Sequence, residues 1–214
     1  MYNNQIVQLK KLYSIKKSDI LKRLRYFKTT WAKSDNEIFS ELCYCILTPQ
    51  SKAEICYEII RKLKDNKLLF NGSINEIRPY LKKARFYNNK SEYIIRAREF
   101  FKINESIYIK DKLNTKDIFF TREWLIRNIK GIGFKEASHF LRNIGFGENL
   151  AILDIHILKN LMKFGIIEEL PKSLTKEKYL NTENKLREFS KKIKIPMSYL
   201  DLLFWSNETG KIFK

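Results

Sequence analysis

The sequence predicts an all-α protein, and three observations lead to that prediction. Only seven Gly and four Pro occur in 214 residues, so the chain has few of the residues that build tight turns between strands. Apolar residues recur mostly three and four positions apart, which is helical spacing. The one β-prone run, Ile107-Tyr108-Ile109, is too isolated to build a sheet.

Local patterns place the helices along the chain. Apolar spacing indicates an early helix around residues 21–27 and a second around residues 38–46, which Ser34 or Asp35 is placed to cap. A Ser-x-x-Glu capping box at residues 73–76 precedes another helix. Further helices are expected at 53–63, 90–102, 115–129, 134–143, 154–164, 175–193 and 197–205.

Glycines mark the boundary between two expected domains. The segment Gly145-Phe146-Gly147 ends one helix, and a second helical group begins near Asp154. We expect a central helical barrel over residues 35–147 and a second helical domain built from residues 1–34 and 148–214.

The chain carries a large positive charge. Lys and Arg number 42 against 24 Asp and Glu, which leaves a formal net charge of +18 spread along the whole sequence. Such a surface attracts polyanions, and nucleic acid is the commonest soluble one. A ribosomal-type protein or a mere lysine-rich bias is the alternative. No apolar run is long enough for a membrane span, and the N-terminal segment lacks the apolar stretch of a signal peptide.

The cysteines indicate a reduced, intracellular protein. Cys43, Cys45 and Cys56 are clustered and odd in number, so we expect buried thiols rather than a disulfide framework. A zinc site is not expected, because there is no C-x-x-C pair and His139 and His156 are far from the cysteines in the sequence.

A glycine-containing turn joins two of the expected helices. In the run Leu125–Asn143, one helix ends near Lys130, Gly131 and Gly133 form the turn, and Phe134 opens the next helix. The glycines permit a tight turn and close approach to another surface. Because the turn leads into a helix N-terminus, its N–H groups are expected to bind a DNA phosphate.

This hairpin and the segment after it resemble the endonuclease III superfamily of base-excision glycosylases. In that family a lysine two residues after the G-x-G turn is the nucleophile, and an aspartate about one helix downstream is essential. The resemblance implies these roles for Lys135 and for Asp154 in the run Ile152–His156. Gly145-Phe146-Gly147 departs from the family's frequent small or Pro-containing loop.

The chemistry of the two side chains agrees with that resemblance. Cleaving an N-glycosidic bond develops positive charge on the sugar, so a free amine and a carboxylate are a useful pair. Lys135 can attack C1′ and form an imine, while Asp154 stabilises the oxocarbenium-like state. The alternatives are a solvated surface lysine and an aspartate that only caps its helix. His156 is expected to pack or to contact a phosphate, and His139 to be structural.

Two further segments are similar to parts of the superfamily. Gln50 follows a helix ending in Leu47-Thr48-Pro49, where relatives insert a side chain into the gap left by a flipped base. The alternative is an ordinary polar residue at a helix end. Phe86 lies in the run Arg85–Ile94, similar to a segment near the base pocket, where it could stack on a base or belong to the core.

The chain's last residues are similar to the compact type of 8-oxoguanine DNA glycosylase found in archaea and some bacteria. The run Tyr199–Lys214 has the form D-L-x-x-W-x-x-x-T-G-x-x-x-K. The resemblance implies that Trp205 stacks on the flipped base and that the terminal carboxylate of Lys214 accepts a hydrogen bond from 8-oxoguanine. That base differs from guanine by an N7–H donor, which an acceptor must read. Packing within its helix is the alternative for Trp205.

Together these features predict a bifunctional 8-oxoguanine DNA glycosylase and apurinic-site lyase of base excision repair. We expect two helical lobes with a DNA-binding cleft between them, acting as a monomer on double-stranded DNA. No redox cofactor or catalytic metal is expected. An iron–sulfur cluster is excluded because no cysteine after Cys56 is available to bind it. A monovalent cation could bind the hairpin carbonyls, as in relatives. The alternatives are a glycosylase for another oxidised or alkylated base, and a non-catalytic hairpin module that only grips DNA.

Overall fold

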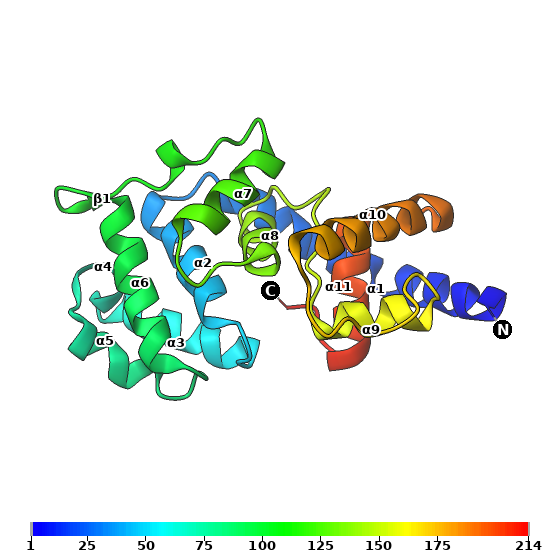
Figure 1. Cartoon of the computed structure of the whole chain (residues 1–214), viewed down its shortest axis with the longest axis horizontal. Coiled ribbons are helices and arrows are strands. Elements are labelled where there is room, and N and C mark those ends of the chain that lie inside the picture. The colour runs from blue at the N-terminus through cyan, green and yellow to red at the C-terminus, as the bar shows by residue number, and fades with distance from the viewer. Residues whose placement is uncertain (1, 214) are drawn as a thin grey trace.

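Helices form two groups that share one long N-terminal helix, as Figure 1 shows. The computed structural model describes residues 2–213, with side chains from Asn4 onward. In chain order the elements are α1 (Tyr2–Thr30), α2 (Asp35–Leu47), α3 (Ala53–Asp65), α4 (Leu68–Asn71), α5 (Ile74–Leu81), α6 (Tyr87–Phe101), β1 (Lys102–Ile103), β2 (Ser106–Ile107), the 3-10 turn η1 (Lys110–Lys112), α7 (Ile118–Asn128), α8 (Phe134–Asn143), α9 (Ile155–Lys163), α10 (Lys176–Ile193) and α11 (Met197–Thr209).

Helix α2 lies at the centre of the first group. It follows the N-cap Ser34, and all its residues from Ile38 to Leu47 are buried. A helix that is buried on every side must be surrounded by other elements, and α2 packs against α3, α6 and α8. The first core is therefore built around α2 from buried apolar residues between Ile38 and Leu150.

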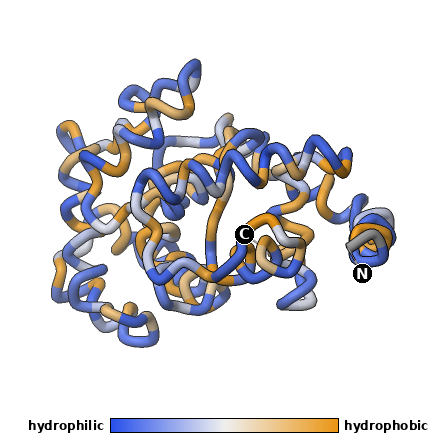
Figure 2. Tube along the Cα trace, turned by 45° about the vertical axis from the view of Figure 1, so that its right-hand side comes forward, coloured by the Kyte–Doolittle hydropathy of each residue, from blue (hydrophilic) through white to orange (hydrophobic). Residues whose placement is uncertain are grey.

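The second group is assembled from both ends of the chain. Leu9, Ile20 and Phe27 of α1 pack with apolar residues between Ala151 and Phe204, which form the second core. Helix α11 packs against α1, α9 and α10, and Figure 2 shows hydrophobic and hydrophilic positions alternating along the helices. The two-domain division stays a prediction, and it is supported by the change from one core to the other between Leu150 and Ala151.

Two segments differ from the expectation. The β-prone run around Ile107 does pair: β2 forms a two-stranded antiparallel hairpin with β1, Lys102 opposite Ile107. Asn104 makes the turn possible by adopting a left-handed φ of 53°. The early helix is also longer than residues 21–27 indicated, because α1 begins at Tyr2 and is largely polar where it leaves the core.

Gly145 allows the loop after α8 to lie against α1. Its φ is +99°, and a Cβ there would come within 3.0 Å of Lys28 Cα and 3.1 Å of the Phe27 carbonyl oxygen. A side chain would therefore meet backbone, which cannot move aside. The expected end of α8 at these glycines is confirmed, since the helix ends at Asn143.

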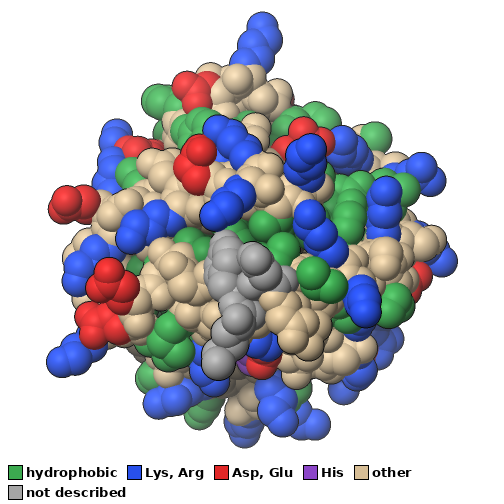
Figure 3. Space-filling model, turned by 90° about the vertical axis from the view of Figure 1, so that its right-hand side faces the viewer, with side chains coloured by type: hydrophobic (Ala, Val, Ile, Leu, Met, Phe, Trp, Pro, Cys, Tyr) green, Lys and Arg blue, Asp and Glu red, His purple; other side chains and the backbone are tan. Residues whose placement is uncertain are grey.

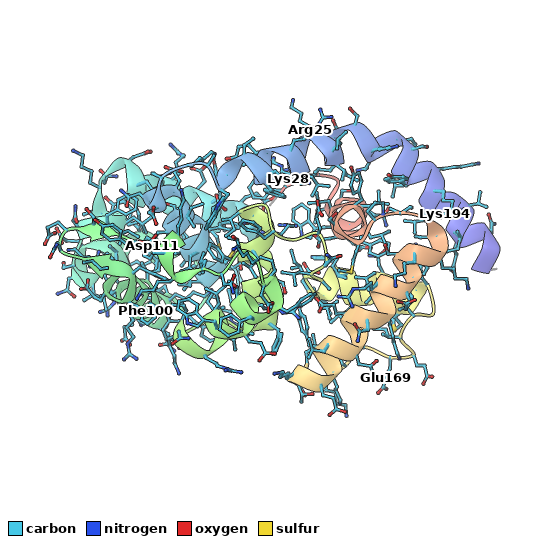
Figure 4. The ribbon with its side chains drawn as sticks, turned by 90° about the horizontal axis from the view of Figure 1, so that it is seen from above. Arg25, Lys28, Phe100, Asp111, Glu169 and Lys194 are labelled. Carbon is cyan, nitrogen blue, oxygen red and sulfur yellow. The ribbon has the colours of Figure 1, made fainter. Side chains whose placement is uncertain are left out.

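Basic side chains cover much of the surface. Figure 3 shows Lys and Arg spread over one end of the molecule, where they outnumber the Asp and Glu side chains among them. Figure 4 shows α1 along one edge, with the exposed Arg25 and Lys28 on it. Among residues 2–213, no helix is both long and apolar enough to cross a membrane.

Candidate active site

The hairpin between α7 and α8 has the expected shape. Helix α7 ends at Asn128, and α8 begins at Phe134. Gly131 is required there, because its φ is +87° and a Cβ would lie 2.4 Å from the Tyr93 ring. Gly133 is not required for its backbone conformation, which is extended at φ −108°.

The N–H groups of the turn are only partly free to bind an anion. Gly133 donates its backbone N–H to the side chain of Glu136, with an N to Oε2 distance of 3.2 Å. A phosphate at this position must therefore displace the Glu136 carboxylate or use the other N–H groups that begin α8.

A pocket of about 480 Å³ lies between the two groups of helices. Its walls come from the α2–α3 turn, from α8, from the start of α9 and from α11. Five of the predicted site residues line it: Gln50, Lys135, Asp154, His156 and Trp205. Residues separated by more than 150 positions in the sequence are thus brought to one cavity.

Lys135 stands in the first turn of α8. Its side chain is 25% exposed, and Nζ lies 3.3 Å from Oε1 of Glu136. The amine therefore has one acidic neighbour on its own helix and an open side toward the pocket.

Asp154 is the N-cap of α9. Its Oδ1 accepts the backbone N–H of Ile157 at 2.8 Å, which fixes the carboxylate at the positive end of the helix. The capping role considered from the sequence is therefore confirmed. The same side chain lines the pocket. The capping bond therefore fixes the carboxylate at the pocket and does not turn it away from it.

Trp205 is partly buried and meets the last described residue. Its ring is stacked on Phe213, with centroids 6.4 Å apart and planes inclined by 28°. Phe213 also contacts Tyr57 of α3 edge to face at 5.8 Å. The end of the chain thus reaches from α11 to the first group of helices, and Figure 1 places it between the groups. Lys214 lies outside the described residues.

Phe86 stands apart from the pocket. It is 52% exposed, adopts a left-handed φ of 58° at the start of α6 and packs under the Arg85 guanidinium at 5.0 Å. Of the two interpretations considered, membership of the core is wrong, because an exposed ring is not part of the core.

A comparison with known families decides the identification. The family model for 8-oxoguanine DNA glycosylase matches residues 20–195. This range includes every element that lines the pocket except α11. The chain belongs to the 8-oxoguanine DNA glycosylase family.

Individual relatives cover the whole chain. An 8-oxoguanine DNA glycosylase/AP lyase of Fusobacterium nucleatum is 47% identical over 214 residues, 99% of each sequence. The crystal structure of the Methanocaldococcus jannaschii 8-oxoguanine glycosylase/lyase with a 15mer DNA containing 8-oxoguanine superposes with a TM-score of 0.87 at 40% identity, covering 97% of this chain and 100% of that one. The Thermotoga maritima 8-oxoguanine DNA glycosylase gives 0.87 at 31% identity over the full length of both chains.

The pocket also contains an ion pair that the sequence did not reveal. Arg142 of α8 and Asp201 of α11 are both buried and are paired through Nη1 and Oδ2. Burial raises the pKa of Asp201, Arg142 lowers it, and the nearby charge of Asp154 raises it. The only signal was periodicity: Lys135, His139 and Arg142 are spaced i, i+4, i+7 on one side of α8, and all three line the pocket.

A buried lysine supports the turn that carries Gln50. Gln50 is exposed and has a left-handed φ of 54° in the α2–α3 turn. Lys90 of α6 donates from Nζ to the carbonyls of Leu47 and Pro49, both at 2.7 Å, and to Ser51 Oγ at 3.0 Å. Sequence reasoning singled out its segment but not this residue, because the acceptors are about 40 positions away.

We predict that Lys90→Met destabilises the protein by about 1–3 kcal/mol, because it leaves buried carbonyls of the turn without their donor. Denaturant unfolding measures the change, with the exposed neighbour Lys83→Met as the matched control. Equal unfolding midpoints for the two variants would show that Lys90 does not hold the turn.

Proposed function

We infer that the chain excises 8-oxoguanine from DNA and then cleaves the strand at the resulting abasic site. It is a bifunctional DNA glycosylase and AP lyase of base excision repair. The observation that carries this function is the pocket that holds the Lys135 amine and the Asp154 carboxylate together. A hairpin that only grips DNA needs neither side chain in such a pocket.

Lys135 is proposed as the nucleophile. Its Nζ attacks C1′ as the N-glycosidic bond breaks, and the base leaves with the bonding electrons. Opening of the sugar ring gives an imine between Lys135 and C1′. The imine acidifies the C2′ proton, and loss of that proton with breakage of the 3′ C–O bond completes β-elimination.

Asp154 is proposed to act through its charge. A carboxylate fixed by the α9 N-terminus needs no reorganisation when positive charge develops on the sugar, so it stabilises the transition state relative to the ground state. It can also take a proton from the attacking amine. Two aspartates, Asp154 and Asp201, line the pocket. Asp201 is paired with Arg142, whereas Asp154 forms no ion pair with a described side chain.

The remaining predicted residues are proposed to bind the DNA. Trp205 offers an aromatic face to the flipped base, and the Lys214 carboxylate reads the N7–H donor. Gln50, exposed on the turn that Lys90 supports, fills the gap in the duplex, and the exposed Phe86 ring stacks on a base. The phosphate contacts are assigned to the turn at Gly131 and Gly133 and to His156.

No step of this scheme calls for a metal ion. Among residues 2–213 there is no group of three or more His, Cys, Asp or Glu side chains placed to hold a metal ion. A monovalent cation on the hairpin carbonyls remains a proposal that rests on the family resemblance.

We predict that borohydride traps the wild-type protein covalently on duplex DNA containing 8-oxoguanine and that Lys135→Gln abolishes the trapping. The glutamine removes the only amine assigned to imine formation while keeping a side chain of similar length. Gel analysis of the reduced complex measures the adduct, and Lys130→Gln, in the exposed part of the same hairpin, is the matched control. Undiminished trapping by Lys135→Gln would move the nucleophile elsewhere.

We predict that Asp154→Asn slows excision by about 10²- to 10³-fold with DNA affinity retained. Asparagine caps helices as well as aspartate does, so this variant loses the charge but keeps α9 in place. Single-turnover kinetics give the rate, and thermal unfolding checks the fold. Asp154→Ala, which loses the cap as well, is expected to be less stable by about 1 kcal/mol. A wild-type rate for Asp154→Asn would remove the catalytic role.

We predict that deleting Lys214 reduces excision of 8-oxoguanine about tenfold or more, since a site built to hydrogen-bond a base loses its acceptor. Cleavage at a preformed abasic site should change much less. Lys214→Ala is the matched control, because it keeps a terminal carboxylate at the same position. Equal losses on both substrates would contradict the recognition role.

A further inference from the structure

Two almost fully buried polar side chains of helix α10 are used by no step of the proposed reaction. Tyr179 is 1% exposed and Glu183 is 2% exposed, and they lie one turn apart on the helix. Both contact residues 151–153, a segment without regular secondary structure that leads directly to Asp154. They belong to the second group of helices and lie outside the lining of the pocket.

The two side chains hold the backbone of this segment. Tyr179 Oη donates to the Ala151 carbonyl at 2.6 Å and accepts the N–H of Leu153 at 3.4 Å. Glu183 Oε1 accepts the N–H of Ala151 at 2.7 Å. Burial raises the pKa of Tyr179 well above its ordinary value, so the hydroxyl keeps the proton that it donates. These bonds satisfy buried backbone groups that belong to no helix.

The same residues contact the hairpin that carries Lys135. Arg122 of α7 forms a bidentate ion pair with Glu183, with Nη1 to Oε1 at 2.7 Å and Nη2 to Oε2 at 2.9 Å. Both side chains are 2% exposed. Phe134, the residue before Lys135, packs on the Tyr179 ring with centroids 5.2 Å apart. The Arg122 guanidinium lies 5.3 Å from the Phe134 ring.

One cluster therefore touches both sides of the reacting pair. It hydrogen-bonds to the backbone of Ala151, three residues before Asp154. It also packs against Phe134, the residue before Lys135. The start of α10 is tied to α7 as well, by Lys176 and Glu123 at 2.8 Å, and Figure 1 shows α10 beginning beside the hairpin helices. Rotation of α8 or displacement of residues 151–153 would break contacts in this cluster.

We propose that Tyr179 and Glu183, together with Arg122, are positioning residues that set the separation between Lys135 and Asp154. The proposal rests on the roles given above to those two residues. Reacting groups must be held within about 0.5 Å of their productive positions, and a misplacement of about 1 Å can cost about 10²-fold in rate. The cluster acts through the backbone next to each group and touches no substrate.

The test uses Tyr179→Phe, which removes the hydroxyl and keeps the ring that packs on Phe134. We expect single-turnover excision of 8-oxoguanine from duplex DNA to slow about tenfold, with the dissociation constant for DNA changed less than about twofold. Ser190→Ala is the matched control. It removes a buried hydrogen bond of the same length, 2.6 Å from Ser190 Oγ to the Ile195 carbonyl, at the other end of α10. We expect this control to lower the melting temperature to a similar extent without slowing excision.

A double variant distinguishes positioning from general loosening. If Tyr179 acts by placing Asp154, adding Tyr179→Phe to Asp154→Asn slows excision by much less than the tenfold seen alone, since the charge to be placed is gone. Full multiplication of the two effects, or equal slowing by Ser190→Ala, overturns the proposal. A wild-type rate for Asp154→Asn itself would instead contradict the proposed function, so the two failures are distinguishable.

Discussion

Two buried ion pairs join the two groups of helices, and the pocket depends on both. Arg122 pairs with Glu183 between α7 and α10, and Arg142 pairs with Asp201 between α8 and α11. A charge removed from water is tolerable only when it is paired and hydrogen-bonded, and removing one partner of such a pair typically costs about 3–5 kcal/mol. The groups are therefore held in the arrangement that satisfies both pairs. The Lys135 helix and the Asp154 cap face one cavity as a consequence.

Several residues of the site perform structural and chemical tasks together. Asp154 caps α9 and presents its carboxylate to the pocket. Glu136 receives the N–H of Gly133 and also lies beside the Lys135 amine. Because the same groups stabilise the backbone and shape the site, the geometry is preorganised in the protein, which is the condition under which fixed charges stabilise a transition state most effectively.

Local patterns predicted most of the helices, and the family resemblance proposed roles for Lys135 and Asp154, which line one pocket. The capping box at Ser73 and Glu76 is present, α8 covers the predicted residues, and the membership of the family agrees with the resemblance of the hairpin. Spacing could not reveal the ion pairs, since their partners are 61 and 59 positions apart and only the folded chain brings them together. The support of the Gln50 turn by Lys90 and the contact of Phe213 with Tyr57 were hidden for the same reason.

The most direct test of the account is to locate the covalent bond between protein and DNA. The complex formed with 8-oxoguanine duplex is reduced with borohydride and digested with protease, and the modified peptide is sequenced by mass spectrometry. The account predicts that the sugar is attached to Lys135. Attachment to Lys52, which also lines the pocket, or to the nearby Lys90 would contradict it.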